Sequence, residues 1–236
     1  DSYPEKIRVI LNKKNIGARA NFIATHSAAK GEYIAHVDCD DYFLPGKLQA
    51  QADVLDNEPE CNIVWHRMRV LDENSGQVRD DMISHPLIWN AKYTRSDLLR
   101  YGAIGCHSSK MYRTKYRFFE LLPDPSPDFT YNILNVDIGY SRYISDFYGV
   151  YRRSEGTETS APNYSVYLNE LSYFQEQYPE FTEQISENAL LMFLVCIRNF
   201  DSNFWFAFRI FIKSKSLKPI IRLIRDWQIR KCFRLD

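Results

Sequence analysis

The stretch GEYIAHVDCDDYFLPGKLQAQADVL, residues 31–55, joins an apolar run to a dense acidic turn. The run before Asp38 predicts a buried strand. Three carboxylates, Asp38, Asp40 and Asp41, then occupy four positions, and Pro45 opens a predicted helix that reaches about the end of the stretch. Like charges this close repel one another unless a positive group lies among them. The stretch is therefore either a cation site at a strand end or a solvent-exposed acidic turn.

Strand and helix patterns alternate on both sides of this stretch. A run rich in Ile, Val and Leu at 6–12 predicts a strand, an Ala-rich segment at 18–30 predicts a helix, and 62–72 predicts a further strand. This order is typical of an α/β fold with a mostly parallel sheet, in which ligands bind at the carboxyl ends of strands. We therefore expect Asn15 and Gly17, which follow the first strand, to face the same crevice as the acidic turn.

The remainder of the chain predicts a second region that is helical. Before it we expect a helix at 92–102, a strand at 106–113, a Pro-rich loop at 121–139 that turns into a helix near Asp128, and a strand within 140–154. Residues 155–163 have the composition of a loop, and four segments with helical periodicity follow. The sequence thus predicts an α/β domain over residues 1–160 and a helical, basic and aromatic region over residues 161–236.

Charge is unevenly distributed along the 236 residues, although the formal net charge is zero. From Cys196 to the C-terminus ten Lys and Arg residues face three Asp residues, which gives that tail a charge of +7. A basic amphipathic helix with aromatic residues suits an anionic membrane surface, and it equally suits a helical lid packed on the domain. No recognition motif accompanies the basic residues, so a nucleic-acid partner is not expected. No apolar run reaches the roughly 18 residues of a spanning helix.

Five cysteines with wide spacings and no C-x-x-C pair favour reduced thiols in a cytosolic protein over a disulfide framework. Cys106 and His107 are adjacent, but no other residue stands at metal-site spacing from them, so the sequence does not predict a zinc site there. The acidic turn is the better candidate. Hard cations such as Mg²⁺ and Mn²⁺ prefer carboxylate oxygens and bridge to phosphates. An EF-hand loop is excluded, because its sixth position would be Phe43 rather than Gly.

The order and spacing of these residues closely resemble the family 2 glycosyltransferases of the GT-A fold. The resemblance runs from about Ile7 to about Ser160 and is most specific through Leu55. The matching positions are Asn15, Gly17, Asn21, Gly31-Glu32-Tyr33, the acidic cluster, Pro45, Lys47-Leu48 and Gln51. Two later segments also match, SSKMYR at 108–113 and the segment from Asp128 to Gly156.

The resemblance implies a role for each matching residue. Asp38 and Asp40 match the pair that holds Mn²⁺ or Mg²⁺ on the diphosphate of a sugar nucleotide, and Asp41 matches an acidic residue near the donor sugar. Asp128 matches the general base of inverting members. Two further positions complete the expected nucleotide-sugar site: the loop of Asn15 and Gly17, beside the nucleotide, and Arg152, near the diphosphate.

The implied function is a metal-dependent transfer of sugar from a nucleotide-diphosphate sugar, with a UDP-sugar as the expected donor, to a glycan or lipid-linked acceptor. The expected setting is cell-surface polysaccharide synthesis in the cytoplasm, at the inner face of the membrane. The chain departs from the family by lacking its first strand-helix-strand unit and the His that often follows Arg152 by two places. A catalytically inactive fragment that binds a membrane or a partner is therefore the alternative. A nucleotidyltransferase is a third interpretation, for which the chain shows no Gly-rich basic phosphate loop.

Overall fold

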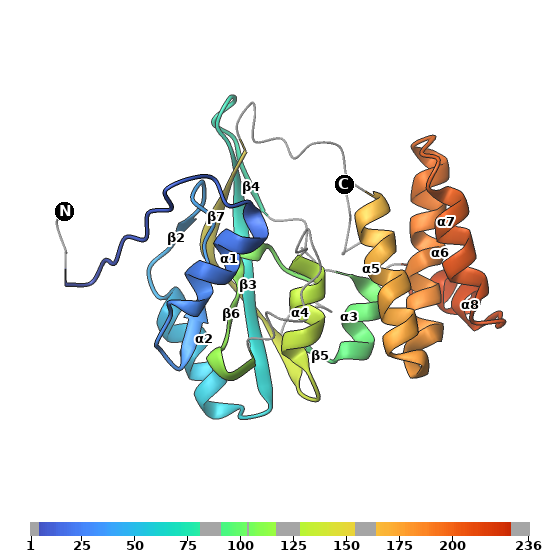
Figure 1. Cartoon of the computed structure of the whole chain (residues 1–236), viewed down its shortest axis with the longest axis horizontal. Coiled ribbons are helices and arrows are strands. Elements are labelled where there is room, and N and C mark those ends of the chain that lie inside the picture. The colour runs from blue at the N-terminus through green and yellow to red at the C-terminus, as the bar shows by residue number, and fades with distance from the viewer. Residues whose placement is uncertain (1–4, 81–90, 103, 117–127, 154–163, 228–236) are drawn as a thin grey trace.

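The computed structural model of the chain describes residues 5–80, 91–102, 104–116, 128–153 and 164–227 (Figure 1). Its elements are, in chain order, α1 Ala18–Ser27, β1 Tyr33–Ala35, β2 Tyr42–Phe43, α2 Lys47–Asn57, β3 Cys61–Asp72, β4 Val78–Asp80, β5 Lys92–Tyr93, α3 Arg95–Tyr101, the 3₁₀ turn η1 His107–Ser109, β6 Met111–Arg113, the 3₁₀ turn η2 Thr114–Tyr116, α4 Asp128–Val136, β7 Tyr140–Arg153, α5 Tyr164–Gln177, the 3₁₀ turn η4 Pro179–Phe181, α6 Thr182–Arg198, α7 Phe204–Ile212 and α8 Lys218–Arg225.

The central sheet is mixed and has the strand order β1-β6-β3-β7-β2, with β4 paired to β3 and β5 paired to β7. The long strands β3 and β7 run parallel over almost their whole length. The other described pairings are antiparallel. The predicted α/β fold with a helical C-terminal part is confirmed. The sheet departs from the mostly parallel arrangement that we expected, because short strands flank the parallel pair in the opposite direction.

Strand β3 places alternate side chains on opposite faces of the sheet, as the pleat of a strand requires. Val64 is fully buried on the side of α2, where it shares a cluster with Leu55. Ile63 and Trp65 are fully buried on the other side, in the cluster that includes residues of α4 such as Ile133. Figure 1 shows α2 and α4 on opposite sides of the sheet. Because both faces are covered, apolar residues from both sides of β3 are buried.

The C-terminal helices share the main hydrophobic core with the sheet domain. Leu168 and Phe174 of α5 and Ile185 of α6 are fully buried in the same cluster as Leu99 of α3 and Phe129 of α4. Helices α5–α8 form a layer beyond α3 and α4 (Figure 1). The four helical segments that the sequence predicted correspond to α5, α6, α7 and α8, and the end of the fourth lies outside the described residues. The predicted boundary between residues 160 and 161 lies outside the described residues.

The strand predicted at 6–12 is wrong. Residues 7–12 have no regular secondary structure, and the apolar side chains among them are 44–86% exposed. The pattern of Ile, Val and Leu was a valid strand signal, but a strand also needs a neighbour to complete its hydrogen bonds. No described strand pairs with this segment. Figure 1 shows it running away from the sheet toward the N-terminus.

Candidate active site

Ser108, in the 3₁₀ turn η1, holds two carboxylates of the acidic turn together. Its hydroxyl oxygen lies 2.5 Å from Asp41 Oδ2 and 3.1 Å from Asp38 Oδ2, and it accepts a hydrogen bond of 3.0 Å from the backbone N–H of Asp38. The turn follows β1, whereas η1 precedes β6, and these two strands are antiparallel neighbours. The pairing of β1 with β6 therefore brings two segments that are distant in sequence into one site.

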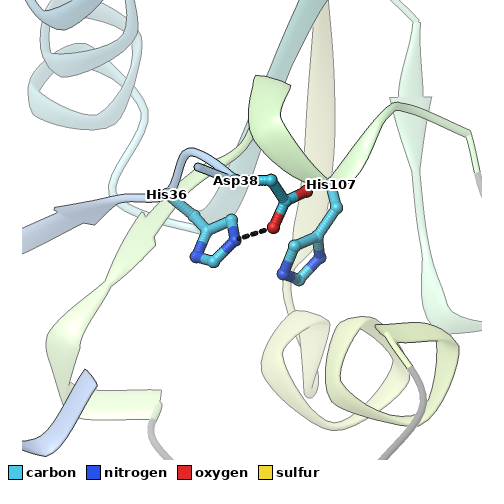
Figure 2. Close-up of side chains that lie close together, drawn as sticks. All are labelled: His36, Asp38 and His107. Carbon is cyan, nitrogen blue, oxygen red and sulfur yellow. Dashed lines mark hydrogen bonds and ion pairs between the residues drawn. The ribbon is translucent and has the colours of Figure 1, made fainter. Parts of the chain in front are cut away.

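Three potential metal ligands converge at the same place: His36, Asp38 and His107 (Figure 2). Each offers one ligand atom, and these atoms all lie within 4.8 Å of one another. His36 Nε2 is 2.9 Å from Asp38 Oδ1, and the rings of His36 and His107 meet edge to face with centroids 3.9 Å apart. The two imidazoles are largely buried, with 15% and 13% of their side-chain surfaces exposed. We call these three residues the His–Asp–His cluster.

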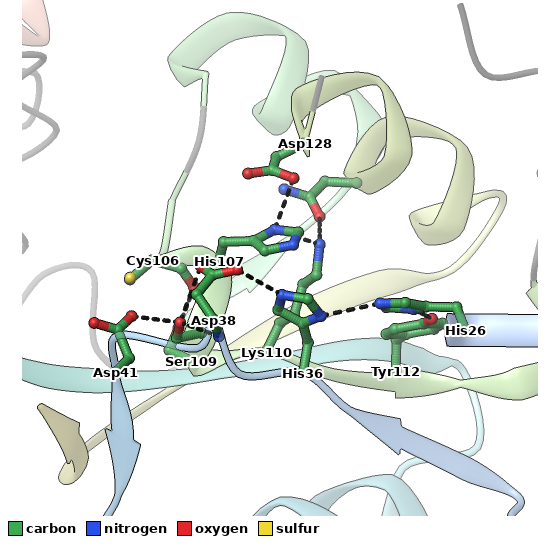
Figure 3. Close-up of polar contacts among 12 residues, drawn as sticks. His26, His36, Asp38, Asp41, Cys106, His107, Ser109, Lys110, Tyr112 and Asp128 are labelled. Atoms are coloured by element: carbon green, nitrogen blue, oxygen red, sulfur yellow. Dashed lines mark hydrogen bonds and ion pairs between the residues drawn. The ribbon is translucent and has the colours of Figure 1, made fainter. Parts of the chain in front are cut away.

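Hydrogen bonds extend the cluster in two directions (Figure 3). On one side, His36 Nδ1 lies 2.9 Å from His26 Nε2, and His26 Nδ1 contacts the hydroxyl of Tyr112. On the other side, His107 Nδ1 lies 2.8 Å from Asp128 Oδ1, the first residue of α4. In Figure 3, His107 lies between Asp38 and Asp128. The candidate base Asp128 and the acidic turn thus belong to one connected set of side chains.

Two buried lysines lie beside the acidic turn, and the charge of one of them, Lys110, interacts with Asp38 and Asp128. Lys47 Nζ donates hydrogen bonds of 3.3 and 3.0 Å to the carbonyl oxygens of His36 and Ser108, and it lies 3.7 Å from the centroid of the Phe43 ring. Lys110 Nζ lies 2.9 Å from His107 Nδ1 and 3.4 Å from an oxygen acceptor on α4, Asn132 Oδ1. Burial lowers the pKa of Lys47 to about 7 and that of Lys110 to about 8.

Burial and neighbouring charges set the protonation states of the histidines and of Asp128 in the site. Burial, assisted by neighbouring positive groups, lowers the pKa of His26 to about 3 and that of His107 to about 4, so both imidazoles are neutral at pH 7. Burial alone would raise the pKa of Asp128, but the hydrogen bond with His107 and the charge of Lys110 outweigh it and lower the pKa to about 2. Asp128 is therefore fully ionised and able to accept a proton.

The pKa values of the two carboxylates joined by Ser108 shift in opposite directions. Partial burial opposes the charge of Asp38, but its hydrogen bond with His36 lowers the pKa overall. Partial burial also acts on Asp41, and there it raises the pKa despite hydrogen bonds from Ser108 and from the backbone N–H of Arg152. The proximity of Asp40 and Asp38 adds to that rise.

The other residues that the sequence singled out lie at different distances from this set. Asp40 is an exposed residue of the same turn. Arg152 donates its backbone N–H to Asp41 Oδ1 at 3.0 Å, while its guanidinium pairs with Glu73. Asn15 and Gly17 form a turn before α1, in which the Gly17 N–H donates to Asn15 Oδ1 at 2.8 Å. Within the described ranges, neither of these two makes a hydrogen bond or ion pair with the acidic turn.

Sequence reasoning missed His36 and His107 as partners of the acidic turn. His107 was set aside because no metal-site spacing surrounds it, and its acidic neighbours Asp38 and Asp128 lie far away in the chain. A polar His36 inside an otherwise apolar strand was the available signal. Lys47 and Lys110 were likewise missed as buried neighbours of the site, because a lysine on a helix or before a strand is normally exposed.

The profile of the family described as "Glycosyl transferase family 2" matches residues 1–118 of the chain. An uncharacterised protein of Mycobacterium tuberculosis is 33% identical over 153 residues, which is 64% of this chain and 43% of that protein. An uncharacterised glycosyltransferase of Haemophilus influenzae is 24% identical over 241 residues, which covers 93% of this chain and 77% of that protein. This chain thus spans less than half the length of the mycobacterial relative.

The crystal structure of Staphylococcus aureus TarS, residues 1–349, superposes on this chain with a TM-score of 0.53. The superposition covers 78% of this chain and 55% of the TarS chain, at 16% sequence identity. At that identity the likeness concerns the fold alone.

Proposed function

This chain belongs to glycosyl transferase family 2, and from that premise we propose that it moves a sugar from a nucleotide-diphosphate sugar, with a UDP-sugar as the expected donor, to a hydroxyl of a glycan or lipid-linked acceptor. The proposed transfer inverts the anomeric centre and serves cell-surface polysaccharide synthesis at the inner face of the membrane. An uncharacterised glycosyltransferase of Methanocaldococcus jannaschii, 29% identical over 76 residues, also supports the reaction class.

One observation carries the proposal: His107 contacts Asp128 at 2.8 Å and also belongs to the cluster that contains Asp38. A glycosyl transfer needs an acidic strand end for the donor and a carboxylate base for the acceptor, close enough to act on one bond. The two carboxylates come from residues 90 positions apart, and the imidazole of His107, which bonds Asp128, also has a ring nitrogen within 4.8 Å of an Asp38 oxygen.

Asp128 is proposed as the general base. Its ionised carboxylate removes the proton of the acceptor hydroxyl, the oxygen forms a bond to the anomeric carbon, and the bond from that carbon to the diphosphate oxygen breaks on the opposite face. A pKa of about 2 makes Asp128 a weak base. A bound acceptor that excludes water would raise this pKa by desolvation, which increases the tendency to take a proton.

Asp38 and Asp40 are proposed to hold Mn²⁺ or Mg²⁺ when the donor is bound. The oxygen ligands fit such an ion, since Asp38 is held by Ser108 and Asp40 is exposed at the same turn. When bound, the ion offsets the charge of the diphosphate. Asp41 is proposed to face the donor sugar.

Asn15, Gly17 and Arg152 are proposed to contact the nucleotide and its diphosphate. For Arg152 this requires its guanidinium to leave Glu73, with which it pairs. Both side chains of that pair are partly exposed, at 40% and 32%, so the exchange costs little.

The proposal is tested by thermal unfolding with UDP, GDP and dTDP, each with and without Mn²⁺, on the native chain and on Asp38→Asn. Binding to the folded state at a hundredfold excess over the dissociation constant adds about 2.7 kcal/mol of stability. A Mn²⁺-dependent rise with one nucleotide, lost in Asp38→Asn, supports the donor site. Absence of any nucleotide effect on a chain that unfolds cooperatively contradicts it.

A peripheral membrane contact is a second proposed property, and the exposed apolar side chains of the C-terminal helices favour it. They include Trp205 and Ile212 of α7 and Ile221 and Ile224 of α8, which are 48–72% exposed. Basic residues are interspersed among them, which suits anionic lipid headgroups. No helix in the described part of the chain is both long and apolar enough to cross a membrane.

A further inference from the structure

We propose that a relay of hydrogen bonds, formed by Tyr112, His26 and His36, positions the Asp38 carboxylate. The Tyr112 hydroxyl donates to His26 Nδ1, and His26 Nε2–H donates to His36 Nδ1. His36 Nε2–H then donates to Asp38 Oδ1. The inference rests on the proposed function for what Asp38 does toward the donor, whereas the direction of the relay is measurable without metal or nucleotide. His26 and Tyr112 are positioning residues that act through His36.

The fold gathers these groups on one face of the sheet. Strand β1 pairs with β6 so that Ile34 lies opposite Tyr112, and beyond β1 the His36 N–H donates to the Lys110 carbonyl oxygen at 3.1 Å. Ile34 and His36 are two positions apart in extended chain, so their side chains leave the same face. His26, in the last turn of α1, meets them there (Figure 3).

Asp38 fixes the direction of the relay. Its pKa is lowered overall, so the carboxylate is ionised and only accepts, and the His36 Nε2 atom 2.9 Å from Oδ1 carries the hydrogen. In the neutral tautomer with hydrogen on Nε2, His36 Nδ1 is an acceptor. Burial lowers the pKa of His26 to about 3, so His26 carries a single ring hydrogen. Placed on Nε2, 2.9 Å from His36 Nδ1, this hydrogen completes the bond and leaves His26 Nδ1 to accept from Tyr112.

Packing holds the relay in place. His26 is 3% exposed and Tyr112 is fully buried, so bulk water does not compete for their hydrogen bonds. The Phe22 ring stacks on His26 with centroids 3.9 Å apart, and the Tyr131 ring meets His26 edge to face at 6.1 Å. These ring contacts fix the plane of the His26 imidazole, and the Tyr112 hydroxyl fixes its tautomer.

The relay orients Asp38 through one of its two oxygens. Oδ1 is held by His36, while Oδ2 lies 3.1 Å from the Ser108 hydroxyl. Carboxylates that bind a metal are held by outer hydrogen bonds of this kind, and loss of one costs about 10–100-fold in metal affinity. Both ring nitrogens of His36 are engaged in the relay, so His36 acts on Asp38 and is not itself a ligand.

Nitrogen-15 NMR of the histidines tests the direction of the relay on the native chain without metal or nucleotide. Near neutral pH, His26 and His36 should both carry hydrogen on Nε2 and have bare Nδ1 atoms. Tyr112→Phe removes one hydroxyl and should turn His26 into a mixture of two tautomers. Tyr131→Phe is the matched control, because its ring also packs against His26, and it should leave the tautomer unchanged. Hydrogen on His36 Nδ1, alone or together with hydrogen on Nε2, overturns the proposal.

A second experiment asks whether the relay positions Asp38. His36→Gln keeps an N–H near the place of Nε2, whereas His36→Asn has its N–H near the place of Nδ1. Affinity for Mn²⁺, measured with whichever of UDP, GDP and dTDP stabilises the native chain, should fall by about 10–100-fold in His36→Asn. His36→Gln should recover most of that loss. Tyr112→Phe should weaken binding when His36 is present and have no further effect in His36→Asn.

Two results overturn the positioning role: equal Mn²⁺ affinities in His36→Asn, His36→Gln and the native chain, or an equal loss in both variants, which would reflect packing alone. A native chain that binds none of the three nucleotides with Mn²⁺ contradicts the donor site instead, and the histidine tautomers then still decide whether the relay exists. Unfolding curves without metal verify that each variant is folded.

Discussion

His107 and Asp128 pair at 2.8 Å and so tie the turn before β6 to the first residue of α4. Neither residue is near the other in sequence. The pair fixes where the candidate base stands relative to the acidic turn, and it also sets the protonation behaviour of that base.

Replacing His107 should raise the pKa of Asp128. In the native chain the pKa is about 2, chiefly because the His107 hydrogen bond and nearby positive charge outweigh burial. In His107→Asn we expect the pKa of Asp128 to rise. In a plot of transfer rate against pH, the fall in rate on the acidic side should then begin at a higher pH. NMR titration of the Asp128 carboxyl carbon measures this directly. An unchanged pKa would show that Lys110 alone controls the carboxylate.

Lys47 should make the chain more stable as pH rises above neutrality. Its pKa is about 7 in the folded chain, against about 10.4 when unfolded, because burial disfavours the ammonium. Between these values the unfolded state binds more protons, so the free energy of unfolding should increase by at most roughly 1.4 kcal/mol per pH unit. Urea unfolding from pH 7 to pH 10 should show this rise, and Lys47→Met should lack it. Equal slopes in the two proteins would contradict the assignment.

Glu170 of α5 should position α4 and therefore Asp128. Its Oε1 accepts hydrogen bonds from the backbone N–H and the hydroxyl of Thr130, at 2.9 and 2.5 Å, in the first turn of α4. Glu170→Leu leaves these buried donors without that partner and should cost about 1–3 kcal/mol and reduce the transfer rate. Glu170→Gln keeps an acceptor oxygen and is the control, with near-native activity expected. Equal loss in both variants would mean that charge, not positioning, matters.

The same Glu170 predicts a second pH dependence of stability. Burial raises its pKa to about 7, despite the hydrogen bonds from Thr130. The folded state therefore binds the proton more tightly than the unfolded state, and stability should fall as pH rises from about 4.5 to about 7. Glu170→Gln should remove this part of the slope in unfolding curves measured over that interval.

The exposed stripe on α8 should bind anionic membranes. Lys218 and Arg222 pair with Glu183 of α6, so the outward face of the helix is left mainly to Ile221 and Ile224. Replacing both isoleucines by Ser should reduce co-sedimentation with vesicles that contain phosphatidylserine, without lowering the unfolding midpoint. Pro219→Ala is unsuitable as a control, since Pro219 is buried. Arg209→Gln, at an exposed position of α7, measures instead how much a basic side chain contributes to vesicle binding. Equal sedimentation of native and isoleucine-substituted chains would contradict a membrane role for this face.

Elements covered on both faces could be predicted from the sequence. Strand β3 was expected at 62–72 and spans Cys61–Asp72, because the apolar residues Ile63, Val64, Trp65, Met68 and Val70 are spread along it and buried on both faces. The segment at 6–12 is also rich in Ile, Val and Leu, but no described strand pairs with it. Local composition signals a strand, and only tertiary contacts decide whether one forms.

The acidic half of the candidate site was also predictable, but its histidines were not. Asp38 and Asp41 are close in sequence, so their joint position follows from the turn. His36 and His107 are 71 residues apart, and only the antiparallel pairing of β1 with β6 brings them together. Sequence motifs report spacing along the chain, whereas this cluster depends on the register between two strands.

The hydrophobic cluster shared by the sheet and helices α3–α6 has a consequence for how the chain unfolds. Phe174 of α5 and Ile185 of α6 are fully buried against the same residues that anchor α4. Detaching the C-terminal helices would expose this surface, so they and the sheet should melt cooperatively, as one foldon. A destabilising substitution in α7 or α8 would then lower the fraction of molecules in which the candidate active site is folded.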